Sequence, residues 1–164
     1  MLQMFYPEKW VKSTYEIDFE ELYQQGFRGL LFDIDNTLVK HGEDATEEVI
    51  VLFRRLKSIG FQICLISNNK MERVERFNKM VNVKYIYDAH KPSKKNYMKA
   101  MELMNTDLSN TLFVGDQLFT DVFGAKRIGM HNILVEPIDK QEEIQIVLKR
   151  YLEKVVLYFY KKQL

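Results

Sequence analysis

The chain contains the stretch GLLFDIDNTL at residues 29–38, an apolar run that leads directly into two aspartates. Gly29–Ile34 has the length and composition of a strand that is buried on both faces. Asp33 and Asp35 close this run, and Asn36 and Thr37 follow with turn-forming side chains. The stretch therefore predicts a central strand whose carboxyl end carries two carboxylates.

Outward from this strand, short apolar runs alternate with helical patterns along the chain. Strands alternating with helices indicate a parallel sheet with helices on both faces. The predicted class is α/β, a Rossmann-like three-layer sandwich with a central parallel sheet. The further predicted strands are Phe61–Ser67, Val83–Tyr87, Thr111–Gly115 and Asn132–Val135; the predicted helices are Ala45–Ile59, Met71–Met80, Lys94–Met104, Leu118–Ile128 and Gln141–Tyr160.

The length of 164 residues suits a single domain. We expect residues 1–28 to form an N-terminal extension with a helix, residues 29–136 the catalytic core, and residues 137–164 a C-terminal helix. Asp44 with Glu47 resembles a capping box at the start of the first core helix, and Gly60 is a suitable stop.

Composition excludes several classes of protein. Hydrophobic residues make up 46% and the formal net charge is +1, so nonspecific nucleic-acid binding is not expected as the main role. The single cysteine, Cys64, excludes a disulfide scaffold. No signal peptide or run of about 20 apolar residues is recognisable. We expect a soluble, cytoplasmic protein, with peripheral contact at the inner face of the membrane as an open alternative.

Polar side chains also follow the other predicted strands. Ser67 and Asn68 end the second strand, and Asp116 ends the fourth, with Asp121 about one helical turn later. Lys91 precedes a proline and is therefore expected in an extended segment. Ligands of such sheets bind beyond the carboxyl ends of the strands, so these side chains are expected to meet there.

These residue types suit phosphoryl transfer. A carboxylate beside a divalent cation stays ionised and can attack phosphorus, while a second carboxylate can protonate the leaving oxygen. Lysine can neutralise the charge of the transition state. A calcium-binding loop is a poor match, because Leu38 stands where that loop needs glycine. Taken alone, Asp33 and Asp35 could also merely cap a turn, and Asp116 could cap a helix.

The order Asp33-x-Asp35-x-Thr37, Ser67, Lys91 and Gly115-Asp116-x(4)-Asp121 resembles the haloacid dehalogenase (HAD) superfamily of phosphohydrolases. The resemblance spans residues 31 to 121 and implies the HAD fold. The spacing and the segment after Asp116 look like subfamily IIIA, and specifically like the YqeG-like proteins. Those are similar to mitochondrial phosphatidylglycerophosphate phosphatases.

The resemblance also implies a role for each residue. Asp33 would be the nucleophile that forms an aspartyl-phosphate, and Asp35 would act as acid and then as base. Mg²⁺ would bind Asp33, the main-chain oxygen of Asp35, and Asp116, with Asp121 supporting it directly or through water. Ser67 and Lys91 would bind the transferring phosphoryl group, and Thr37 would order the loop after the nucleophile. Thr37 and Asn68 are further candidates for substrate and phosphate binding, and Asn68 could equally have an ordinary turn role.

The implied function is Mg²⁺-dependent hydrolysis of a phosphomonoester. The gaps after Thr37 and after Asn69 are too short for the cap domain that many HAD proteins insert, so an open site is expected. Phosphatidylglycerophosphate or another bulky substrate fits that expectation. Nucleotides, sugar phosphates or nucleic-acid ends are the alternatives within the enzyme class. A non-catalytic scaffold protein that retains the fold is the alternative outside it.

The sequence does not specify what the two terminal segments of the chain contact. Met1–Trp10 is rich in aromatic and apolar residues, and the C-terminal helix ends in aromatic residues followed by lysines. Either segment could contact a membrane surface or pack onto the domain, and a homo-oligomer is a further alternative. Apolar stripes at helical spacing usually face a core. The stripe in question comprises Ile144, Leu148, Leu152, Val155 and Phe159.

Overall fold

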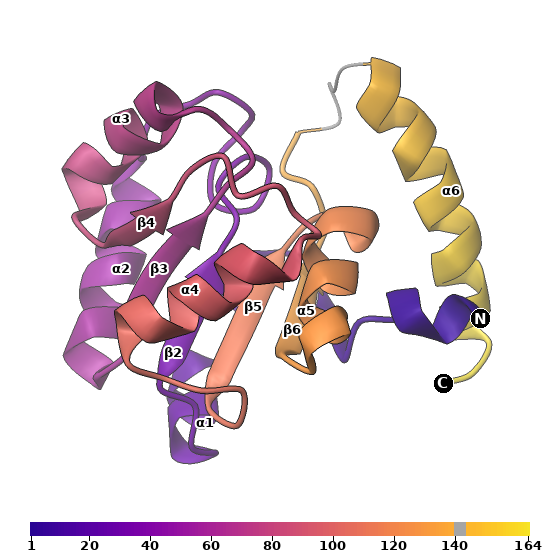
Figure 1. The fold of residues 1–164 in the computed structure, drawn as a ribbon, viewed down its shortest axis with the longest axis horizontal. Coiled ribbons are helices and arrows are strands. Elements are labelled where there is room, and N and C mark those ends of the chain that lie inside the picture. The colour runs from indigo at the N-terminus through magenta and orange to yellow at the C-terminus, as the bar shows by residue number, and fades with distance from the viewer. Residues whose placement is uncertain (140–143) are drawn as a thin grey trace.

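The computed structural model describes residues 1–139 and 144–164, and it is built on one parallel six-stranded sheet (Figure 1). The strand order is β1-β6-β5-β2-β3-β4, which places β2 and β5 in the middle. The predicted α/β class with a central parallel sheet is therefore confirmed. The strands are β1 (Lys9–Val11), β2 (Gly29–Phe32), β3 (Gln62–Ile66), β4 (Lys84–Ile86), β5 (Thr111–Gly115) and β6 (His131–Val135).

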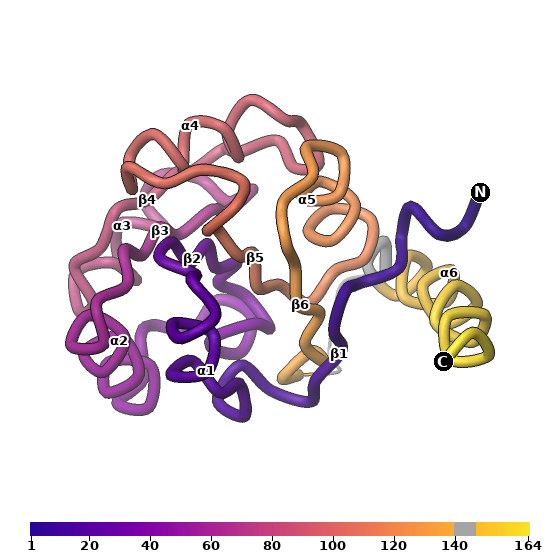
Figure 2. The backbone as a smooth tube through the Cα atoms, turned by 90° about the horizontal axis from the view of Figure 1, so that it is seen from below, coloured from indigo at the N-terminus to yellow at the C-terminus, as the bar shows by residue number. Residues whose placement is uncertain are grey.

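Helices cover both faces of this sheet, as the end-on view shows (Figure 2). One face carries α1 (Phe19–Gln24), α2 (Glu47–Ile59) and α3 (Met71–Val81), and the other carries α4 (Lys94–Met104) and α5 (Phe123–Ile128). The last helix, α6 (Ile144–Lys161), lies beyond the β1 edge beside the N-terminal segment. Short helical turns complete the chain: η1 (Leu2–Phe5), η2 (Thr14–Glu16) and η3 (Leu118–Val122).

Alternation of side chains along β2 explains why the layers form. Leu30 and Phe32 point into the core under α1, α2 and α3, whereas Leu31 points into the core under α4 and α5. All four residues of β2 are buried. A strand that is apolar on both faces can be stable only between two helical layers, which is the arrangement observed.

Several element boundaries differ from the sequence-based prediction. β1 was not predicted; it pairs in parallel with β6 at the edge of the sheet. The predicted helix 118–128 begins with one π-helical turn, η3, before α5. Thr46, not Asp44, caps α2, because its side chain accepts a hydrogen bond from the Val49 amide at 3.4 Å. Gly60 ends that helix as predicted, with φ at +120°.

The apolar stripe of α6 was expected to face a core, and that expectation is wrong. Leu148, Leu152, Val155 and Phe159 are exposed, while Glu153 and Val156 are buried. The predicted start of the helix at Gln141 lies outside the described residues, as does the side chain of Ile144. No helix in the described parts of the chain has the length and apolarity needed to span a bilayer.

Candidate active site

A pocket of about 180 Å³ lies at the carboxyl ends of the central strands. Five predicted site residues line it, namely Asp33, Asp35, Ser67, Asn68 and Lys91. The strand-end rule therefore brings together residues that are far apart in the sequence. The pocket is completed by Asn36, His41, Asn69, Gln117 and Thr120.

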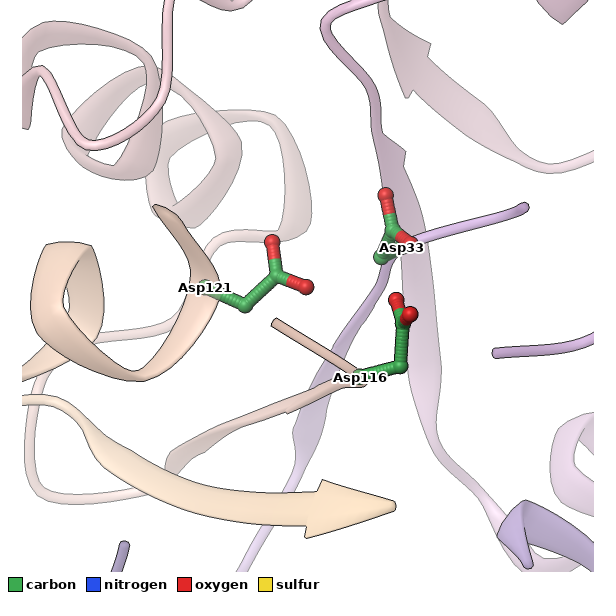
Figure 3. A group of neighbouring side chains, drawn as sticks. All are labelled: Asp33, Asp116 and Asp121. Atoms are coloured by element: carbon green, nitrogen blue, oxygen red, sulfur yellow. The ribbon is translucent and has the colours of Figure 1, made fainter. Parts of the chain in front are cut away.

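Three aspartates gather at this end of the sheet, and one of them, Asp33, lines the pocket (Figure 3). One carboxylate oxygen from each of Asp33, Asp116 and Asp121 lies within 4.8 Å of the others, and all three residues are buried. Asp33 follows β2, Asp116 follows β5, and Asp121 projects from η3 toward them. Neighbouring β2 and β5 pair in register from Gly29 with Thr111 to Phe32 with Val114, so the residues that follow the two strands emerge at the same edge of the sheet.

Lys91 joins two of these acids. Its Nζ atom donates to Asp33 Oδ1 at 2.8 Å and to Asp121 Oδ1 at 2.7 Å, and its side chain is buried. Burial alone would lower the pKa of Lys91, but Asp121 and Asp33 together raise it above its ordinary value. The lysine is therefore a fixed cation beside Asp33. Asn68 holds its backbone, accepting from the Lys91 amide through Oδ1 at 2.7 Å.

The Thr37 hydroxyl group lies between Asp33, the candidate nucleophile, and Asp116, which follows β5. Its hydroxyl group lies 3.1 Å from Asp33 Oδ2 and 3.1 Å from Asp116 Oδ1. The single hydroxyl proton can be donated to either carboxylate. Ser67 is buried at the end of β3, where its Oγ accepts from the Asn69 amide at 3.0 Å. Both hydroxyl groups thus have defined partners within the site.

Asp35 occupies a separate part of the site. Its carboxylate is not in the acidic trio; it accepts from the Gly42 amide at 2.7 Å, from Asn69 Nδ2 at 2.5 Å and from Arg73 Nη2 at 2.9 Å. A predicted metal contact through the Asp35 main-chain oxygen stays a prediction. Arg73 of α3 was not identified from the sequence, since its spacing from Asp35 carries no recognisable pattern.

The charges of the site suit a divalent cation. Burial raises the pKa of Asp33 to about 7 and that of Asp116 to about 6, with neighbouring acids adding to both shifts. Oxygen ligands of this kind are those that Mg²⁺ prefers. Among the described residues, four buried carboxylates (Asp33, Asp116, Asp121 and Glu153) are in contact with two cations, the buried Lys91 and the partly buried Arg150. A doubly charged ion would compensate the excess, so the residues present fit the predicted Mg²⁺.

Arg150 is a second residue that the sequence did not indicate. It comes from α6, and its Nη2 donates to Asp116 Oδ2 at 2.5 Å while its Nη1 donates to the Asp116 main-chain oxygen at 2.7 Å. Nη1 also lies 2.9 Å from Glu153 Oε2 on the same helix. Glu153 is the one acidic residue in α6. This single acid is the sequence feature that could have indicated a buried ion pair with Arg150.

The turn after β5 explains how Asp121 reaches the site. A Cβ atom on Gly115 would lie 2.4 Å from Asp121 Oδ2, so the glycine leaves room for the carboxylate. The π-helical turn η3 then directs Asp121 back toward β5, where the Gln117 amide donates to its Oδ2 at 3.1 Å. Gly115 and Asp121 therefore form one structural unit that positions Lys91.

Of the three histidines, His41 lines the pocket. His90 is exposed and does not line the pocket in the described structure, whereas His41 approaches from the loop after β2. The conformation of the loops, which sequence spacing does not specify, determines that His41 and not His90 lies at the pocket.

Known proteins match this chain along nearly its whole length. The protein named "Probable phosphatase YqeG" from Bacillus subtilis is 34% identical over 159 residues, which cover 96% of this chain and 92% of that protein. The HAD-hydrolase-like family model matches residues 89–144. This chain belongs to the HAD-like hydrolases. The predicted superfamily and its YqeG-like branch are confirmed.

Two further matches extend the comparison for this HAD-like hydrolase. "Phosphatidylglycerophosphate phosphatase 1, chloroplastic/mitochondrial" from Arabidopsis thaliana is 27% identical over 93% of this chain, which spans 49% of that protein. The crystal structure of a HAD phosphatase from Thermococcus onnurineus aligns with a TM-score of 0.59 and 14% identity, covering 72% of this chain and 90% of that one. The structural match supports the fold.

Proposed function

We propose that this HAD-like hydrolase is a Mg²⁺-dependent phosphomonoesterase that acts through an aspartyl-phosphate on Asp33. The observation that carries the proposal is the position of Asp33, buried between Lys91, Thr37 and Asp116 and open to the pocket. The enzyme class, a HAD-type phosphatase, is confirmed by the 34% identity with a protein named as a phosphatase.

The first step would be attack of an Asp33 carboxylate oxygen on phosphorus. The bond from phosphorus to the ester oxygen breaks, and that oxygen takes a proton from Asp35. Lys91 would stabilise the negative charge on the phosphoryl group, and Ser67 would donate to one of its oxygens. Bound at Asp33 and Asp116, Mg²⁺ would supply positive charge beside the phosphoryl group, with Asp121 supporting the site mainly by holding Lys91.

The second step would hydrolyse the aspartyl-phosphate. Asp35, now ionised, accepts a proton from a water molecule that attacks phosphorus, and the bond to Asp33 breaks to release phosphate. The hydrogen bonds to Asp35 from Gly42, Asn69 and Arg73 support this role, because they fix its carboxylate at the pocket. Asn68 would act through the backbone of Lys91, in keeping with its hydrogen bond there.

The test of the proposal is the variant D33N with p-nitrophenyl phosphate and Mg²⁺. We expect turnover to fall to background, while circular dichroism stays that of the wild type, because an amide cannot form the acyl-phosphate. D107N is the matched control, since Asp107 is exposed and distant from the pocket. Full activity of D33N, or activity that survives removal of Mg²⁺ with a chelator, would overturn the mechanism.

The substrate that we propose first is phosphatidylglycerophosphate. The similarity to the Arabidopsis phosphatase supports it, and so does a site into which no cap domain is inserted in the described chain. Nucleotides, sugar phosphates and nucleic-acid ends are the competing substrates. Comparing kcat/KM for phosphatidylglycerophosphate in mixed micelles with these soluble esters would decide. A preference of about tenfold or more for a soluble ester would exclude the lipid as the main substrate.

A further inference from the structure

Helix α6 exposes the apolar side that a helix of a soluble domain normally buries. Leu148 is 64% exposed, Tyr151 69% and Leu152 62%, and neighbouring apolar residues on the same side are similarly open. We refer to this set as the apolar α6 face. It comprises Leu148, Tyr151, Leu152, Val155, Tyr158 and Phe159.

The orientation of α6 is fixed by its opposite side. Arg150 is hydrogen-bonded to Asp116, Glu153 accepts from the Leu118 amide at 2.9 Å, and Val156 is buried against the core that contains Leu118. The helix therefore buries its ion pair and presents its apolar residues outward. An exposed contiguous apolar face with a fixed orientation is typical of an interaction surface.

Lysines lie directly against this face. Lys154 Nζ lies 5.3 Å from the ring centroid of Tyr151, and Lys162 Nζ lies 4.6 Å from that of Tyr158. Glu153, the single acid in α6, is buried and paired with Arg150. In the described part of α6, the charged side chains that border the apolar α6 face are therefore lysines.

The N-terminal turn η1 packs against α6. It lies beside the C-terminal part of α6 in both views, with Tyr6 packed on Tyr160 at a ring-centroid distance of 5.3 Å (Figures 1 and 2). Tyr6 and Phe5 face the core, which confirms packing for that part of the segment, while Leu2 and Met4 remain exposed. Exposed apolar side chains therefore occur in η1 as well as in α6.

We propose that the apolar α6 face docks onto the surface of an anionic lipid bilayer. An amphipathic helix with apolar and aromatic residues flanked by lysines binds in the plane of such an interface. A second copy of the chain is the other obvious occupant. A two-fold contact through this face would bring the lysines of the two copies together, without acidic partners from α6. The charge pattern favours the bilayer.

Sedimentation with vesicles tests this proposal. The wild-type chain should bind vesicles of phosphatidylglycerol and phosphatidylcholine, and should bind much more weakly to phosphatidylcholine alone or at high salt. L152E should weaken partitioning about tenfold or more, because it places a charge where an apolar side chain would insert. K162A should weaken it about fivefold. V51E is the matched control, since Val51 is 51% exposed on α2, at the far side of the molecule (Figure 1).

The controls separate this inference from the proposed function. L152E should keep wild-type turnover of p-nitrophenyl phosphate, whereas D33N should lose turnover and still bind vesicles. Equal binding of wild type and L152E, or no binding to anionic vesicles, would overturn the proposal. A concentration-dependent dimer that L152E dissociates, in a chain that ignores vesicles, would assign the face to self-association instead.

Discussion

Among single residues, Arg73 of α3 shows how Asp35, the proposed acid–base residue, is held in place. Its Nη2 donates to Asp35 Oδ1 at 2.9 Å, and its side chain is largely buried against Phe77. Its Nε and Nη1 atoms are buried with no hydrogen-bond partner in the described part of the chain. Burying these two donor atoms without partners destabilises the folded protein. We infer that Arg73 nevertheless occupies this position because it orients Asp35, which makes it a positioning residue.

We predict that R73Q lowers kcat by about 10- to 100-fold and changes KM by less than about threefold. Misplacement of an acid–base group by a fraction of an ångström reduces catalysis more than binding. R73K should recover part of the loss by restoring the charge. Steady-state kinetics with an aryl phosphate measure both constants, and R54Q, at an exposed position of α2, is the control. A change confined to KM would place Arg73 in substrate binding instead.

Among the elements, α6 contributes to the active site through a buried ion-pair network. Arg150 connects Asp116 with Glu153, and burial raises the pKa of Glu153 while Arg150 opposes that shift. Removing one partner from a buried pair leaves an uncompensated charge, whereas removing two partners costs less. The network should therefore show strong coupling between Arg150 and Glu153.

We predict that R150M lowers the free energy of unfolding by about 3 kcal/mol, and that the double variant R150M/E153L regains part of this loss. Urea denaturation of the four proteins in the cycle measures the coupling. R55M is the control, because Arg55 forms an exposed ion pair with Glu20 that should contribute less than about 1 kcal/mol. A loss for R150M as small as that of R55M would show that α6 does not support Asp116.

The elements also show what sequence patterns can and cannot specify. The predicted bounds of Lys94–Met104 and Thr111–Gly115 agree with α4 and β5, because long periodic runs and buried apolar runs have strong local signals. β1 has three residues, and its pairing with β6 depends on the completed sheet. Periodicity identified the apolar face of α6, yet the buried pair of Arg150 and Glu153 decides which side packs inward.

The residues of the candidate site also include some that sequence patterns indicate and some that they do not. Asp33, Ser67, Lys91 and Asp116 were predictable, because each follows a strand in a motif whose spacing survives in the sequence. Arg73 and Arg150 were not, since they reach the site from helix faces with no fixed spacing to the aspartates. Strand-end residues are placed by topology, whereas helix residues are placed by packing.

For the molecule as a whole, the buried aspartates link stability to pH. The ordinary pKa of aspartate is 3.8, and burial raises it to about 7 for Asp33 and to about 6 for Asp116. Between these values the folded protein retains protons that the unfolded chain has released. Stability therefore falls as pH rises from about 4 to about 7, by an amount on the order of a few kcal/mol.

We predict that the melting temperature of the metal-free protein falls between pH 5 and pH 8, and that D33N is more stable than the wild type at pH 8. Replacing the carboxylate by an amide removes a buried charge and keeps an oxygen that can accept from Lys91. Thermal melts in a chelating buffer measure both effects. A wild-type protein that becomes more stable toward pH 8 would contradict the burial argument.

Mg²⁺ should reverse this trend, because it binds the ionised carboxylates and stabilises the folded state by mass action. At pH 8, adding Mg²⁺ should raise the melting temperature of the wild type, and the increase should be smaller at pH 5.5, where Asp33 and Asp116 must first release protons. D33N should lose most of the increase, whereas L152E should retain it, since Leu152 lies outside the pocket. An equal increase for D33N would place the ion elsewhere and would remove the electrostatic reason for burying three aspartates together.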